Sequence, residues 1–195
     1  MVTVRDVSSV DWVDVERVFG TRGDPAGCWC QFYKVSNKEM LDMGSAGCSS
    51  RLRQQVLATS RTTPSPGLVA YLDDEPVGWI AVEPRTSYPT ALRGKVVSAG
   101  STEDPEDATV WAVVCFVVRV GFRRRGIGAN LLESAVLHAR DKGARLLEGY
   151  PVDVGARTKV SSAEPYHGTL SIFVRAGFEV VSQPAPGRAV VSLRL

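Results

Sequence analysis

The sequence has 195 residues and a formal net charge of +2, with 44% hydrophobic and 23% charged residues. This length and composition predict one globular domain that can bury a core without disulfides or metals. The net charge is too small to argue by itself for a nucleic-acid or membrane partner, and no apolar run approaches the roughly 20 residues that cross a bilayer. The start of the chain lacks the apolar core of a signal peptide, so we expect a cytoplasmic protein.

Four cysteines occur, at Cys28, Cys30, Cys48 and Cys115. A chain of this size without a secretion signal does not need a disulfide framework. Only Cys28 and Cys30 are close in sequence and no histidine lies near them, which does not fit the paired knuckles of a zinc site. We therefore expect no metal and reduced thiols packed as small hydrophobic groups; a reactive or pocket-lining thiol is the alternative.

The first third of the chain predicts a short strand followed by helices. Residues 2–7 favour a strand, and Ser8 and Ser9 are placed to cap a helix that ends near Phe19. Residues 20–27 read as a loop, and the aromatic stretch 28–34 reads as a short strand or a pocket wall. A helical turn at 37–43 and a helix at 49–60 follow.

The remaining two thirds predict a sheet with helices on both of its faces. Residues 68–84 indicate a hairpin that turns at 73–76, and residues 85–108 read as a long loop. The apolar run 109–118 reads as a strand covered on both sides, followed by a helix over about 125–142 and another apolar strand at 144–153. This order predicts a right-handed parallel βαβ unit. A loop at 154–168, a short helix at 169–176 and a closing strand pair complete a mixed α/β domain.

The turn between the buried strand and the long helix, RVGFRRRGIGANLL, is the least ordinary stretch of the sequence. A P-loop would need Lys and Ser or Thr where Ile127 and Gly128 stand, and a dinucleotide fingerprint would need a third glycine. The free N–H groups of a helix start bind anions, and Gly126 and Gly128 permit close approach of a phosphate. An ordinary turn with solvated arginines is the alternative.

The residues RRRGIG resemble the [Q/R]-x-x-G-x-[G/A] signature of the GNAT superfamily of acetyl-CoA-dependent N-acetyltransferases, in particular its bacterial members. The preceding strand and the late helix that ends in Gly177-Phe178 are also similar. The resemblance covers about residues 67–195, with 1–66 as N-terminal helices and acceptor-side elements of the same domain. It implies a largely antiparallel central sheet in which one pair of parallel strands splays apart.

The resemblance also implies where acetyl-CoA binds. The backbone amides of residues 124–129 should hold the pyrophosphate, and the pantetheine arm should run along residues 116–118. An N–H near Val118 would polarise the thioester carbonyl. Phe173 stands where many members have a tyrosine that protonates the leaving thiolate. The residues expected at acetyl-CoA are Phe116, Val117, Val118, Arg123, Arg124, Arg125, Gly126, Ile127, Gly128, Ala129, Asn130 and Phe173.

By the same resemblance, an amine attacks acetyl-CoA directly in a ternary complex, so no enzyme nucleophile is needed. A general base would help, yet the strand at 110–118 contains no acid. The open catalytic roles have four candidates: Glu83, Glu148, Tyr166 and His167. Each also has a plain interpretation, because Glu148 can simply pair with an arginine while Tyr166 and His167 can be surface loop residues.

The acceptor is less well defined by the sequence. Aromatic residues in three stretches are candidates for a substrate pocket, although such residues often belong to a core: Trp29, Tyr33, Trp79, Tyr88 and Tyr150. They favour a small, partly apolar amine as acetyl acceptor. The alternatives are acetylation of protein lysines or N-termini and a non-catalytic acyl-CoA-binding module. We expect neither a nucleic acid nor a membrane as partner; a homodimer stays open.

Overall fold

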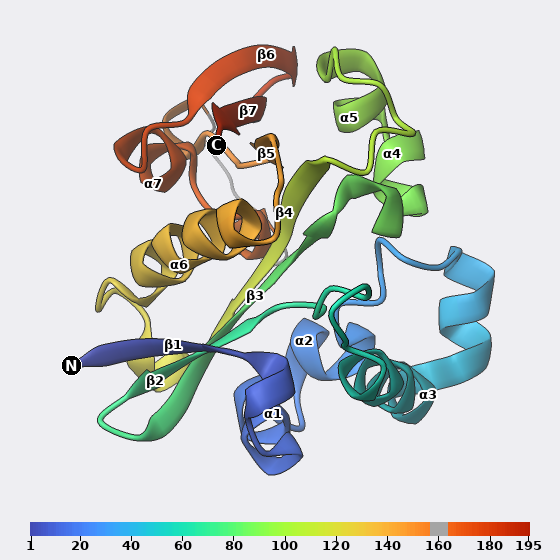
Figure 1. Ribbon diagram of the computed structural model, residues 1–195, viewed down its shortest axis with the longest axis vertical. Coiled ribbons are helices and arrows are strands. Elements are labelled where there is room, and N and C mark those ends of the chain that lie inside the picture. Colours follow the sequence, from blue (N-terminus) through green and yellow to red (C-terminus); the bar gives the residue numbers. More distant parts are fainter. Residues whose placement is uncertain (157–163) are drawn as a thin grey trace.

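The structure is a computed structural model that describes residues 1–156 and 164–195. Its centre is a seven-stranded sheet in the order β1-β2-β3-β4-β5-β7-β6 (Figure 1). Neighbouring strands are antiparallel, except that β4 and β5 run parallel. The strands are β1 Val2–Asp6, β2 Leu68–Leu72, β3 Glu75–Pro84, β4 Val110–Val118, β5 Leu146–Gly149, β6 Glu179–Ala185 and β7 Arg188–Arg194.

Helices cover both faces of this sheet (Figure 1). The long helix α6 and the short helix α7 lie on one face, while the N-terminal helices and the pair α4 and α5 lie on the other. The helices are α1 Trp12–Phe19, α2 Gly23–Cys28, α3 Asn37–Leu57, α4 Pro89–Arg93, α5 Lys95–Gly100, α6 Ile127–Asp141 and α7 Leu170–Arg175. Short 3-10 turns η1 Val7–Ser9, η2 Arg85–Ser87, η3 Val120–Phe122, η4 Val154–Ala156 and η5 Glu164–His167 connect them. The mixed α/β architecture and the parallel pair around α6 confirm the prediction.

Strand β4 separates the two hydrophobic cores. Trp111, Val113 and Phe116 enter the core beneath α6, whereas Val114 and Cys115 both belong to the core on the opposite side. Two adjacent residues share a side because Ala81 pairs with Cys115 and Val82 pairs with Val113, which leaves Val114 as an extra residue. Such a β-bulge re-aims side chains and bends the strand locally.

The structure corrects several predicted boundaries. Residues 20–27 and 85–108, for which the sequence predicts loops, contain most of α2 and the pair α4 and α5. The first helix begins at Trp12 after Asp11 instead of being capped by Ser8 or Ser9. The two helices predicted between 37 and 60 form the single element α3, which is kinked at Gly44. The capping box lies at its start, where Ser36 and Glu39 exchange hydrogen bonds.

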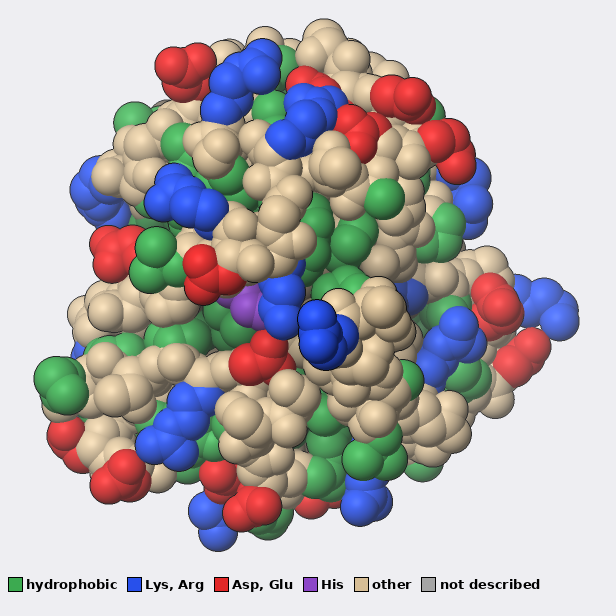
Figure 2. All heavy atoms as spheres, viewed as in Figure 1, with side chains coloured by type: hydrophobic (Ala, Val, Ile, Leu, Met, Phe, Trp, Pro, Cys, Tyr) green, Lys and Arg blue, Asp and Glu red, His purple; other side chains and the backbone are tan. Residues whose placement is uncertain are grey.

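Lys and Arg side chains are interspersed with Asp and Glu over the face shown in Figure 2, so the described residues there form no extended surface of one charge. Within the described ranges, none of the helices is both long and apolar enough to cross a membrane.

Candidate functional site

The parallel strands β4 and β5 separate after a short paired stretch. Their pairing runs from Val110 to Val113 on β4, and β5 ends at Gly149 while β4 continues to Val118. The N–H of Arg119 bonds to the carbonyl of Val77 on β3 at 3.0 Å. Because N–H groups alternate along a strand, those of Val118 and Phe116 point to the other edge, toward the splay. A backbone edge is therefore presented there, as the resemblance predicts.

The glycine-rich turn leads directly from this edge into the long helix. Arg124 and Gly126 both have left-handed backbone, with φ of 63° and 77°. No side chain caps α6, so the first N–H groups and the positive end of the helix dipole remain for an anion. A Cβ on Gly128 would lie 4.0 Å from Cδ1 of Ile172, so that position is open, and its lack of a side chain lets a ligand approach the backbone. The turn therefore fits a pyrophosphate.

The three arginines of this turn, Arg123, Arg124 and Arg125, are exposed. Arg123 donates from Nε to the carbonyl of Val118 at 3.2 Å, which links the turn to the end of β4. The guanidinium of Arg125 lies 5.4 Å from the ring centre of Phe122. These contacts hold two of the arginines near the helix start, where their charge adds to that of the backbone.

A cavity of about 650 Å³ lies on the bulged side of β4. Strand β4, helices α2 and α3 and the turn η5 form its walls. The lining residues are Gly23, Asp24, Pro25, Gly27, Cys28, Phe32, Tyr33, Met40, Leu41, Gly44, Ser45, Val114, Cys115, Val117, Tyr166 and His167. The structure thus places four predicted site residues, Tyr33, Val117, Tyr166 and His167, around one cavity next to the splay.

Tyr33 and His167 are in direct contact at this cavity. The Tyr33 hydroxyl lies 3.1 Å from Nε2 and 3.3 Å from Nδ1 of the imidazole. Burial raises the pKa of Tyr33, and it also raises that of Tyr166, so both phenols stay protonated at neutral pH. The cavity therefore holds one imidazole that can exchange a proton and two phenols that can donate one.

Both acidic candidates are buried in contact with cations. Glu83 is 7% exposed and forms an ion pair with Lys34. Burial raises the pKa of Glu83, and the charge of Lys34 opposes that shift. Glu148 is 1% exposed and accepts hydrogen bonds from Arg85 at 2.9 Å and from the hydroxyl of Ser101 at 2.6 Å. Neither glutamate belongs to the cavity lining.

The other predicted aromatic residues lie in the cores. Trp29 stacks on Phe19 with ring centres 4.7 Å apart, and Trp79 and Tyr88 are fully buried. Tyr150 donates a hydrogen bond to Glu148 at 2.9 Å. These four residues, Trp29, Trp79, Tyr88 and Tyr150, are not part of the cavity lining.

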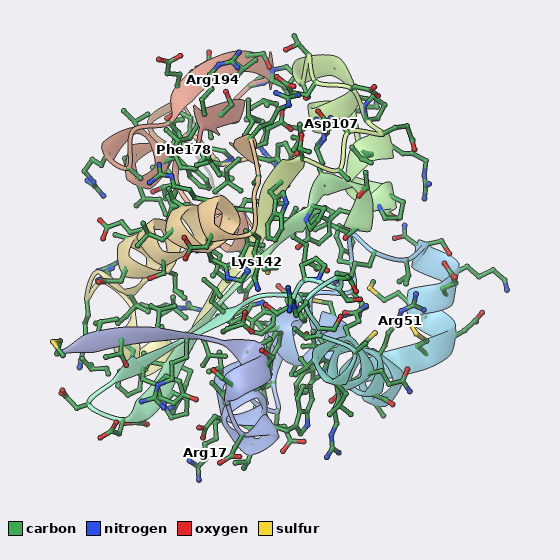
Figure 3. All side chains as sticks on the ribbon, in the orientation of Figure 1. Arg17, Arg51, Asp107, Lys142, Phe178 and Arg194 are labelled. Carbon is green, nitrogen blue, oxygen red and sulfur yellow. The ribbon has the colours of Figure 1, made fainter. Side chains whose placement is uncertain are left out.

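Phe173, predicted to contact acetyl-CoA, is also fully buried. It packs edge-on against Phe116 at 5.9 Å and against Phe178 at 5.1 Å. Figure 3 shows Phe178 between α7 and the β6–β7 hairpin. A Cβ on Gly149 would overlap the Phe173 ring, at 2.2 Å from Cε1, so the missing side chain at the end of β5 makes room for this ring.

Sequence reasoning missed most of the cavity wall. Helix α2 was assigned to a loop, and Met40, Leu41 and Gly44 of α3 carried no chemical signal. For the stretch 28–34 the sequence leaves a short strand or a pocket wall open; the structure has no strand there, and Cys28, Phe32 and Tyr33 line the cavity. The glycines of α2 and α3 were a signal that could have indicated this cavity, because a glycine interrupts a helix and leaves space where a side chain would stand.

The cysteines are free thiols distributed between the core and the cavity. Cys30 and Cys48 are buried, whereas Cys28 and Cys115 line the cavity. Burial raises the pKa of Cys28 to about 12, so its thiol stays protonated at neutral pH. Within residues 1–156 and 164–195, no group of three or more His, Cys, Asp or Glu residues is arranged to hold a metal ion.

A family comparison decides what this arrangement is. The profile of the acetyltransferase (GNAT) family matches residues 29–155, which is more than half of the chain. The chain belongs to the GNAT acetyltransferase family. It is accordingly an acetyl-CoA-dependent N-acetyltransferase, with the splay, the glycine-rich turn and α6 all present in the expected order.

Solved structures of GNAT proteins share the fold of this acetyltransferase. The PaiA N-acetyltransferase of Thermoplasma acidophilum, in complex with coenzyme A, is 12% identical at a TM-score of 0.55 and covers 100% of this chain and 99% of its own. YncA of Salmonella typhimurium with acetyl-CoA is 13% identical at a TM-score of 0.55, covering 100% and 94%. An N-acetyltransferase of Staphylococcus aureus is 13% identical at 0.54, covering 100% and 98%. A comparison with curated proteins finds no match.

Proposed function

We propose that this GNAT enzyme acetylates the primary amine of a small molecule by direct attack in a ternary complex. The observation that carries the proposal is the position of the cavity. It is lined by Val114, Cys115 and Val117 of β4, the strand whose free edge faces the splay, and by His167. An amine held there is next to a proton acceptor and close to the acyl donor, and proximity is the main contribution such an enzyme makes.

The donor half of the site rests on backbone groups. The N–H groups of residues 124–128 hold the pyrophosphate, whereas that of Ala129, which the sequence also suggests, already donates to the carbonyl of Gly126 at 3.0 Å. The edge of β4 at 116–118 pairs with the pantetheine arm. Acetyl-CoA supplies the activated acetyl group when it is bound. The N–H of Val118 points toward the splay and polarises the thioester carbonyl. Arg123, Arg125 and the dipole of α6 balance the phosphate charge.

For the proton transfers we assign His167 as general base and Tyr166 as general acid. The amine nitrogen forms the new C–N bond as the C–S bond breaks; its proton passes to His167, and the departing thiolate takes a proton from Tyr166. Tyr33 orients the imidazole through its hydroxyl. We assign Glu83 and Glu148 to structure, because Lys34 and Arg85 already balance their charges. We further propose one domain over residues 1–195, since α2 and α3 supply the acceptor side.

Release of free thiol from acetyl-CoA, measured over a panel of amines and peptides, tests the function. Turnover of small amines with a lysine peptide left unchanged supports the proposal. If the substrate is a protein, the lysine peptide should be turned over and the small amines left unchanged. Binding of acetyl-CoA without turnover of any amine or peptide would identify an acyl-CoA-binding module and refute catalysis.

The placement of the phosphate site has a test of its own. Gly126→Asp places a carboxylate at the cradle, so we expect it to abolish the thermal stabilisation that acetyl-CoA gives. Gly126→Asn is the matched control, because asparagine has nearly the same shape and also tolerates the left-handed backbone at φ 77°. If both variants keep, or both lose, the stabilisation, negative charge at this position does not act on a phosphate.

A further inference from the structure

Glycines keep the acceptor cavity open on its helical side. Gly23 and Gly27 of α2 and Gly44 of α3 all belong to the lining. A Cβ built on Gly27 or Gly44 meets no heavy atom within 4 Å. At Gly44 the backbone has φ of 58° and ψ of −174°, which kinks α3 where it faces the cavity. The space opposite β4 is therefore set by missing side chains rather than by loose packing.

Polar groups of the lining are largely engaged within the protein. The hydroxyl of Ser45 donates to the carbonyl of Ala26, and Tyr33 bonds to His167 at 3.1 Å. Asp24 also belongs to the lining, but its side chain is exposed, where water screens the charge. A ligand that enters this space mainly meets hydrocarbon surface, which favours apolar groups.

Large apolar side chains of the lining remain in contact with water. Phe32 is 44% exposed and Leu41 is 81% exposed, and Met40 beside them is half-buried. Phe32 packs edge-on against Tyr33 with ring centres 4.9 Å apart. Exposed apolar residues that join an apolar cavity are typical of a surface that a ligand covers.

We infer that the acceptor is a primary amine that carries a bulky hydrocarbon group, an aromatic ring or a branched chain. The hydrocarbon group lies against Phe32, Met40 and Leu41 and fills the space left by Gly27, while the amine points to His167. This inference rests on the proposed function and adds the substrate class and its size limit. Gly27 is the specificity-determining residue, because a side chain at this position would occupy the same space.

The test compares amines of one reactive group and increasing hydrocarbon size: ethanolamine, ethylamine, butylamine and phenethylamine. We expect kcat/KM for thiol release to rise by about fourfold for each methylene that becomes buried. A second readout is independent of turnover: phenethylamine should stabilise the protein against heat in the presence of coenzyme A, and ethanolamine should not. Equal kcat/KM for ethanolamine and phenethylamine would overturn the inference and leave the acetyltransferase intact.

The matched variants are Gly27→Leu and Ala46→Leu. The φ of Gly27 suits any residue, so leucine there fills space without backbone strain; Ala46 is an exposed position of α3 outside the lining. We expect Gly27→Leu to lower kcat/KM for phenethylamine at least tenfold with ethylamine little changed, and Ala46→Leu to alter neither. If no amine is turned over at all, catalysis is refuted, but binding of phenethylamine in the cavity can still be tested. Its thermal stabilisation of the protein should then be lost in Gly27→Leu and kept in Ala46→Leu. Persistence of this stabilisation in Gly27→Leu refutes the inference.

Discussion

The buried ion pair between Arg85 and Glu148 holds together the region where the parallel strands separate. Both side chains are 1% exposed, and Arg85 Nη1 lies 2.9 Å from Glu148 Oε2. The carboxylate also accepts from Ser101 at 2.6 Å and from Tyr150 at 2.9 Å. Arg85 donates in addition to two backbone carbonyls of the segment after α5, at 3.0 and 2.7 Å. One cation thus joins the end of β3, that segment and β5.

Replacing Arg85 by methionine should cost far more than the loss of one contact. The carboxylate of Glu148 would remain buried without a cation, which typically costs about 3–5 kcal/mol. For a chain of this size roughly 2–4 °C of melting temperature corresponds to each kcal/mol, so we expect Tm to fall by about 6–20 °C. Urea unfolding gives the free energy directly. Arg145→Met is the control, because Arg145 forms ion pairs with Glu103 and with Asp107 but is 42% exposed, so water screens these pairs and the loss of stability should be much smaller.

A second substitution checks the cause. Glu148→Gln, added to Arg85→Met, removes the stranded charge and keeps an oxygen that accepts from Ser101 and Tyr150. We expect it to restore much of the lost stability, with a coupling free energy of about 1.5–3 kcal/mol. Additive effects, or equal losses for Arg85→Met and Arg145→Met, would refute this reasoning. If the double variant folds but its kcat falls by about 10²-fold or more, Glu148 takes part in catalysis after all.

Two further predictions concern groups on the acceptor side of β4. His167→Gln should lower kcat by about 10²–10⁴-fold while the stabilisation by acetyl-CoA stays unchanged, and Tyr33→Phe should lower it less; an unaltered kcat and pH profile in His167→Gln would exclude the imidazole as base. Lys34→Met removes the cation that opposes burial of Glu83, whose pKa is already raised. A carboxyl whose pKa is raised by folding stabilises the protein when the pH is below its ordinary pKa, and this stabilisation is lost as the pH rises. The loss in free energy of unfolding caused by Lys34→Met, measured with urea, should therefore be largest at neutral pH and shrink toward pH 4.5. A deficit that is independent of pH would show that Glu83 does not titrate in this way.

Sequence patterns predicted the parts of the fold that local chemistry determines. The apolar run of β4, the stripe of α6 and the glycines that follow α6 and α7 are local signals, and the parallel pair follows from their order. Helix α5 has no comparable signal, because a helix of six residues is not stable alone. It packs against the β6–β7 hairpin. Gly100, its last residue, lies so close to this hairpin that a Cβ there would come within 2.6 Å of Ser182 Oγ. Contacts across such a distance in sequence do not appear in a local pattern.

The candidate site was predicted unevenly for the same reason. Backbone groups of the glycine-rich turn depend on residues adjacent in sequence, so their position could be inferred. The acidic candidates depend on partners far along the chain, since Glu83 meets Lys34 and Glu148 meets Arg85 only in the folded protein. Burial and pairing decide whether a glutamate can accept a proton, and the sequence shows neither.

The bulge at Val114 explains how one strand can serve both halves of the proposed site. In a regular strand Val114 and Cys115 would face opposite sides, and only every second residue of β4 would reach the acceptor cavity. With the extra residue, Val114, Cys115 and Val117 all line it, while Phe116 packs against Phe173 on the other side. The free edge of residues 116–118 therefore lies directly beside the cavity wall. In the proposed site, the strand itself would bring together an amine in the cavity and a thioester along that edge. A run of nine apolar residues without an acid could then form the centre of an acetyltransferase site.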